Sequence, residues 1–195
     1  TECFLSPDGK YNFSKQTGQQ WFMKAARERG MNNFLFFTNS APYFMTRSAS
    51  TLSADEDYIN LQDDKFDDFA LFLVKSAEHF REQGFNVKYI SPINEPNGHW
   101  HTNAFQEGSF ATKADIYRMV EELDKAISKA QIDTSQIRYA DTNVSELGGL
   151  DGCVKDAISK NKIPTNGIFL KMFTCYETYI MFGYRYSSGE YGAII

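Results

Sequence analysis

The chain alternates amphipathic stretches with short, mainly apolar runs. Two stretches, 63–83 and 112–130, repeat apolar side chains every three or four residues, which is the spacing of one buried helix face. Thr112 is a suitable N-cap for the second of them. A further helix is predicted at 14–29, with Ser14 or Thr17 as its cap. The pattern therefore predicts three long helices.

Short apolar runs follow these helices, and their length and composition predict strands buried on both faces of a parallel sheet. The runs span residues 34–37, 87–90 and 137–140. A shorter helix at 150–159 and a strand at 168–172 would make a fourth helix-then-strand unit. Long loops, at 39–53 and 91–111, separate the first strands from the helices that follow them.

This order of elements predicts an α/β domain, because alternating helices and buried strands imply parallel strands joined by right-handed crossovers. A (β/α)8 barrel and an open doubly wound sheet both fit the pattern, and both place ligands at the carboxyl ends of strands. A barrel needs eight strands and about 250 residues. Four units in 195 residues would therefore form roughly half a barrel, over a single domain spanning 1–195.

Composition narrows the classes of function. The chain is 42% hydrophobic and 23% charged, the balance of a soluble globular domain. A net charge of -5, with basic residues interspersed among acidic ones, disfavours a nucleic-acid partner. No apolar stretch approaches the roughly 20 residues that span a bilayer. Cys3, Cys153 and Cys175 are too few and too scattered to predict a metal cage or a disulfide framework.

The most specific motif is SPINEP at 91–96, directly after the predicted strand 87–90. Glu95 thus comes at the carboxyl end of a strand, where barrel enzymes carry their active sites. Glycoside hydrolysis needs a carboxylic acid that protonates the leaving oxygen, together with a second carboxylate. Prolines on both sides stiffen the turn, and the Asn94 amide can hold a sugar hydroxyl. We predict Glu95 as the proton donor, against the alternative of an inert glutamate in a surface turn.

Five stretches carry a family resemblance: WFMKAARERG at 21–30, TNSAPYFMT at 38–46, NL at 60–61, NEP at 94–96 and QEG at 106–108. With them the chain resembles glycoside hydrolase family 30, a family of retaining (β/α)8 enzymes, and most closely its endo-β-1,6-galactanase-like branch. The resemblance covers roughly residues 1–145.

The resemblance implies roles for individual residues. Glu95 would be the acid/base and Asn94 its neighbour on the sugar. Asn39, Trp100 and Glu107 would line the substrate cleft. The strands at 34–37 and 137–140 would be the third and fifth of the barrel, so the chain would hold roughly the third to sixth units.

Aromatic side chains in the strand-end loops are candidates for a sugar platform. Tyr43, Phe44 and Trp100 could stack on an apolar sugar face or simply pack within the fold, and the sequence favours neither. His99 and His101 flank Trp100, but two histidines on a loop without a third ligand do not predict a metal site. The expected mechanism uses neither a metal nor an organic cofactor.

The second carboxylate is harder to place. The family's nucleophile follows the seventh strand, and four strands ending near Met172 do not reach it. Glu177 would qualify only if one element were missing from the count. The segment 171–195 is rich in tyrosine and departs from the family pattern. We therefore expect a partial catalytic domain that carries one half of a catalytic pair and is inactive by itself.

The leading hypothesis is that the intact protein is a retaining glycosidase, acting by double displacement on a β-linked oligo- or polysaccharide such as β-1,6-galactan. A carbohydrate-binding barrel fragment without the nucleophile is the alternative. An α/β enzyme of different chemistry would be favoured if Glu95 lay outside any pocket. Such a glycosidase is expected to be secreted, periplasmic or attached to the cell surface.

Overall fold

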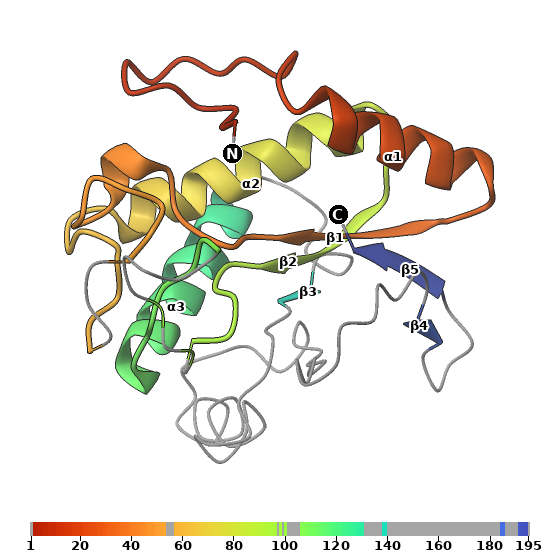
Figure 1. Ribbon diagram of the computed structural model, residues 1–195. Coiled ribbons are helices and arrows are strands. Elements are labelled where there is room, and N and C mark those ends of the chain that lie inside the picture. The colour runs from red at the N-terminus through yellow and green to blue at the C-terminus, as the bar shows by residue number, and fades with distance from the viewer. Residues whose placement is uncertain are drawn as a thin grey trace.

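A computed structural model describes residues 2–53, 57–96, 98, 100 and 106–130, together with the backbone of three short strands farther along the chain. In chain order the elements are α1 (Thr17–Glu28), β1 (Asn33–Phe37), the 3-10 turn η1 (Tyr43–Met45), α2 (Phe66–Glu82), β2 (Val87–Ser91), α3 (Lys113–Lys129), β3 (Arg138–Tyr139), β4 (Tyr184–Arg185) and β5 (Tyr191–Ile194) (Figure 1). The three predicted long helices and the first three predicted strands are confirmed. The predicted helix at 150–159 and strand at 168–172 lie outside the described residues.

The helix starts differ in how they are capped. At α3 the Thr112 side chain accepts a hydrogen bond from the Asp115 backbone N–H, and the Asp115 carboxylate accepts one from the Thr112 N–H, so the predicted cap is confirmed as a capping box. The cap predicted for the first helix is wrong. Gln16 precedes α1 in the left-handed conformation without a capping side chain, and Thr17 is already helical.

The strands form one sheet in the order β3-β2-β1-β5-β4. β1 pairs in parallel with β2 and with β5, β2 pairs in parallel with β3, and β4 is antiparallel to β5. The β4–β5 hairpin falls within 173–195, where no strand was predicted. β5 of this hairpin pairs with β1, which is far away in the sequence, so local sequence patterns could not predict that β4 and β5 extend the sheet beside β1.

The helices decide between the two predicted architectures. β1, β2 and β3 are neighbours in the sheet in the same order as in the chain. Each connection therefore moves one strand in the same direction, and because such connections are right-handed, α2 and α3 lie on the same face of the sheet. The two helices pack against each other, with the Arg118 guanidinium 4.0 Å from the centre of the Phe66 ring. α1 runs along α2 above the strands (Figure 1). One-sided helices are typical of a barrel arc rather than of a doubly wound sheet, while closure into eight strands stays a prediction.

The two faces of the sheet have different environments. Phe36 of β1 packs against Phe80 of α2, with ring centres 5.4 Å apart, so this side faces the helices. Successive residues of a strand point to opposite faces, which places Phe37 and its register partner Ser91 on the other side. In a barrel that side is the interior, and Ser91 is fully buried there. Within the described residues, no helix is both long and apolar enough to cross a membrane.

Candidate active site

The carboxyl ends of β1 and β2 lie side by side because the two strands are parallel and in register up to Phe37 and Ser91. The Thr38 N–H continues the ladder by donating to the Ser91 carbonyl at 3.1 Å. Beyond this point the loops remain in contact, since the Asn94 amide donates to the Asn39 side-chain oxygen at 3.3 Å. Two of the predicted site residues, from loops far apart in sequence, are therefore adjacent.

Glu95 has an unusual backbone. Its φ is 41°, in the left-handed region that residues other than glycine rarely adopt. A residue before proline is additionally pushed toward extended conformations, and Pro96 follows Glu95. The Glu95 carbonyl accepts two hydrogen bonds, from the Gly98 N–H at 2.8 Å and from the Trp100 indole N–H at 2.9 Å. These contacts hold the strained turn, and the Glu95 side chain is half-buried.

Trp100 fills the space behind this turn. Its side chain is only 8% exposed and lies between the backbones of Gly98 and Gly108. A Cβ atom on Gly98 would lie 2.6 Å from the indole, and one on Gly108 would also collide with it. Of the two interpretations left open by the sequence, these contacts favour packing for Trp100, and its stacking on a sugar stays a prediction.

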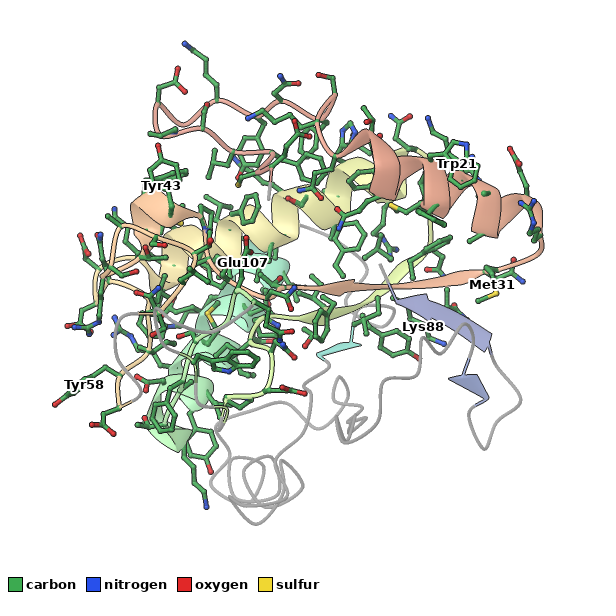
Figure 2. All side chains as sticks on the ribbon, viewed as in Figure 1. Trp21, Met31, Tyr43, Tyr58, Lys88 and Glu107 are labelled. Carbon is green, nitrogen blue, oxygen red and sulfur yellow. The ribbon has the colours of Figure 1, made fainter. Side chains whose placement is uncertain are left out.

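Glu107 joins the site from the loop before α3. Its carboxylate accepts a hydrogen bond of 2.8 Å from the Ser40 hydroxyl, which follows β1. The neighbouring Gly108 forms an isolated parallel bridge with Leu52. Figure 2 shows Glu107 beside the carboxyl end of β1 and Tyr43 farther out on η1. Tyr43 is 52% exposed, so its ring is open to solvent as a sugar platform requires.

A cavity of about 210 Å³ lies on the helix side of the sheet, where Met23 of α1 and Phe72 and Phe80 of α2 line it, and it extends to the carboxyl end of β1. Asn39, Tyr43 and Glu107 are among its lining residues. Glu95 does not line this cavity, and the Asn39–Asn94 hydrogen bond is the described link between the two. The predicted site therefore has two parts. One is the cavity lined by Asn39, Tyr43 and Glu107, and the other is the turn that carries Glu95, the predicted acid.

Residues 1–157 match the model of O-glycosyl hydrolase family 30. The chain belongs to this family. It is 30% identical over 117 residues to an exo-β-1,6-galactobiohydrolase of Bifidobacterium longum subsp. longum, a match that covers 55% of this chain and 7% of that protein. It is 24% identical over 140 residues to an endo-β-1,6-galactanase of Hypocrea rufa, covering 70% of this chain and 29% of the relative.

Solved structures agree with the family assignment. A conserved exported protein from Bacteroides fragilis is 82% identical with a TM-score of 0.69, and the match covers 72% of this chain and 28% of that one. The catalytic domain of a family 30 xylanase C from Talaromyces cellulolyticus is 17% identical with a TM-score of 0.64, over 89% of this chain and 40% of that one. This second likeness shows the fold, that of a family 30 catalytic domain. The family 30 chain thus spans well under half the length of these relatives.

No role was predicted for Asn60, which organises the loop between β1 and α2. Its buried side chain accepts a hydrogen bond from the Ser48 N–H at 3.0 Å and donates to the carbonyls of Ser50 at 3.1 Å and Leu52 at 3.4 Å. Its own N–H donates to the Ser109 hydroxyl at 2.6 Å. The family resemblance drew attention to this asparagine, but only its burial among backbone groups shows what it does.

Ser91, the last residue of β2, has a buried hydroxyl without a hydrogen-bond partner within the described part of the chain. Among those same residues, no group of three histidine, cysteine, aspartate or glutamate side chains could hold a metal ion. His99, His101 and Glu177 lie outside the described residues, so the predictions that concern them stay predictions.

Proposed function

We propose that the intact protein is a retaining glycosidase with Glu95 as its acid/base. The observation that supports this most is the position of Glu95: it follows β2 at the carboxyl edge of the sheet, in a chain that belongs to family 30. Two hydrogen bonds to its carbonyl fix the backbone that carries its carboxyl group. A fixed backbone is what a group needs if it is to exchange protons with one atom of a bound substrate.

In the proposed mechanism Glu95 acts twice. It first donates a proton to the glycosidic oxygen as a second carboxylate attacks the sugar's anomeric carbon and forms a covalent glycosyl-enzyme. It then removes a proton from the water that hydrolyses this intermediate, which restores both carboxyl groups. In this proposal Asn94, whose amide donates a hydrogen bond to Asn39, contacts a sugar hydroxyl beside the reacting bond. The second carboxylate is expected outside the described residues.

We propose a β-linked galactan, with β-1,6 linkages, as the substrate. Both curated relatives act on this linkage according to their names, exo-β-1,6-galactobiohydrolase and endo-β-1,6-galactanase. The exposed Tyr43 ring offers an apolar face, and the Glu107 carboxylate and Asn39 amide offer hydrogen-bonding groups near the carboxyl end of β1. This mixture of one aromatic face and several polar groups suits a sugar.

We also propose that the intact protein acts outside the cytoplasm. The matched protein from Bacteroides fragilis is a conserved exported protein, and it is 82% identical to the part of this chain that it covers. A polymeric galactan is too large and too polar to cross a membrane unaided, so an enzyme that cleaves it must reach it on the outer side.

The decisive experiment compares Glu95→Gln with the matched control Glu28→Gln in the full-length protein. Glu28 is an exposed residue at the end of α1. We expect Glu95→Gln to lower kcat/KM on unactivated β-1,6-galacto-oligosaccharides by roughly 10²- to 10⁴-fold, the usual contribution of a general acid. On aryl glycosides whose leaving group needs no proton, kcat/KM should stay within a few-fold. Glu28→Gln should change neither.

Three outcomes would contradict parts of this proposal. Unchanged turnover in Glu95→Gln would refute the acid/base role. NMR detection of the α anomer as the first product would show inversion and refute double displacement. A wild-type protein that binds galacto-oligosaccharides but cleaves none of a panel of β-linked glycans would instead support the alternative of a carbohydrate-binding protein.

A further inference from the structure

We propose that Trp100 is a positioning residue for the acid/base, and that it acts through the backbone of Glu95 rather than by stacking on the substrate. The inference rests on the proposed role of Glu95. It starts from one contact, the 2.9 Å hydrogen bond from the Trp100 indole N–H to the Glu95 carbonyl.

This contact matters because the Glu95 backbone does not hold its conformation by itself. A left-handed φ of 41° costs free energy in any residue with a Cβ, and the proline that follows disfavours it further. Such strain persists only where surrounding groups over-determine it. Here the Gly98 N–H and the Trp100 indole N–H both donate to the same carbonyl oxygen, at 2.8 Å and 2.9 Å. Removing one donor releases part of that restraint.

The indole is itself held in place. It is 8% exposed and lies so close to Gly98 and Gly108 that neither position has room for a Cβ atom. Gly98 lies in the turn after β2, and Gly108 belongs to the loop that bridges to Leu52, so two segments of the chain enclose the indole. A ring enclosed in this way has little face left for a sugar, and its polar atom already has a partner. Both features favour positioning over stacking.

The predicted consequence is specific to proton transfer. When the indole N–H is removed, the turn relaxes toward extended φ and the Glu95 carboxyl moves relative to the glycosidic oxygen. A displacement of about 1 Å can cost roughly 100-fold in rate. The loss should be large for a poor leaving group, which needs the proton, and small for a good one, which does not.

The experiment uses Trp100→Phe in the full-length protein, which removes the N–H and keeps an aromatic ring. The substrates are phenyl and 2,4-dinitrophenyl glycosides of the sugar that the wild-type protein cleaves. Both place an aromatic ring at the leaving-group side, so loss of a stacking contact would affect them equally. We expect the ratio of kcat/KM for the dinitrophenyl to that for the phenyl glycoside to rise at least 10-fold. Because the ratio is taken on one sample, partial unfolding cancels.

Two further variants sharpen the test. Gly108→Ala pushes the indole from behind without touching any hydrogen-bonding group and should raise the same ratio. Trp21→Phe is the matched control, since Trp21 lies on the outer side of α1 and is 62% exposed (Figure 2). It should leave the ratio unchanged.

The outcomes separate this inference from the proposed function. Glu95→Gln is measured in parallel and should raise the ratio more than Trp100→Phe does. If Glu95→Gln raises it and Trp100→Phe does not, Trp100 is not a positioning residue, although the acid/base assignment stands. An equal fall of kcat/KM on both substrates in Trp100→Phe would show a stacking role and overturn the inference. No rise in Glu95→Gln would refute the acid/base assignment itself.

Discussion

Replacing Asn60 by alanine tests whether a single buried amide holds together the loop that follows β1. The side chain is 6% exposed and makes three hydrogen bonds to backbone groups, two near 3.0 Å and one at the long distance of 3.4 Å. A net contribution of about 1 kcal/mol for each of the two shorter bonds gives a loss of about 2 kcal/mol. Burial of the Ser48 N–H without a partner adds up to about 1 kcal/mol more.

Asn60→Asp is the sharper variant, because it keeps the size of the side chain. Its carboxylate can still accept from the Ser48 N–H, but it faces the carbonyls of Ser50 and Leu52 where the amide donated to them. We expect this acceptor-to-acceptor contact to destabilise the protein at least as much as alanine does.

Urea denaturation measures the free energy of unfolding, and hydrogen exchange followed by mass spectrometry measures protection of the peptide around Ser48. The control is Asn12→Ala, which removes an exposed side chain that accepts hydrogen bonds from the Ser14 N–H and hydroxyl and should cost under about 0.5 kcal/mol. A loss below 0.5 kcal/mol for Asn60→Ala, or an Asn60→Asp variant as stable as the wild type, would refute the reasoning.

Two further predictions concern stability. Thr112→Ala removes the capping box of α3 and should lower the free energy of unfolding, measured by urea denaturation, by about 1 kcal/mol. Thr17→Ala, at the uncapped start of α1, should be neutral or slightly stabilising, and equal effects of the two variants would contradict the capping argument. Burial raises the pKa of Tyr11 to about 12, so the stability that its neutral phenol supports is complete below pH about 10 and falls as the pH rises toward about 12. The free energy of unfolding of Tyr11→Phe should therefore fall less than that of the wild type between pH about 10 and about 12. Tyr58→Phe, at a 62% exposed position, should follow the wild type. A Tyr11→Phe curve parallel to that of the wild type would refute the raised pKa of Tyr11.

The helices and strands that the sequence predicted correctly are those with a strong local pattern. α2 carries a continuous apolar stripe, and its buried residues include Phe66, Ala70 and Ala77. Thr112 lies one residue before α3 and meets Asp115 three residues later, so the cap is a local arrangement as well. The start of α1 was wrong because the chain enters the helix from a left-handed residue, a conformation that depends on contacts made elsewhere.

The sequence predicts which residues form the candidate site, but it does not predict the geometry in which they are held. The position of Glu95 after a strand could be predicted because strand ends follow from the apolar pattern. Its left-handed backbone could not, because the donors that support it come from Gly98 and Trp100 across a turn. The pairing of Ser40 with Glu107, 67 residues apart, likewise depends on tertiary structure. Aromatic identity alone also could not separate the enclosed Trp100 from the exposed Tyr43.

These contacts form one continuous support from the loop after β1 to the predicted acid. Asn60 holds Ser109 through its N–H, and the residue before Ser109 is Gly108, whose backbone lies against the Trp100 indole. Trp100 in turn donates to the Glu95 carbonyl. A barrel supplies strand ends at fixed positions, but the angle at which a carboxyl group leaves its strand is set by the loops. In our proposal Gly108 and the enclosed Trp100 indole fix that angle for Glu95, so residues that act only through its backbone would change how efficiently the proton is delivered.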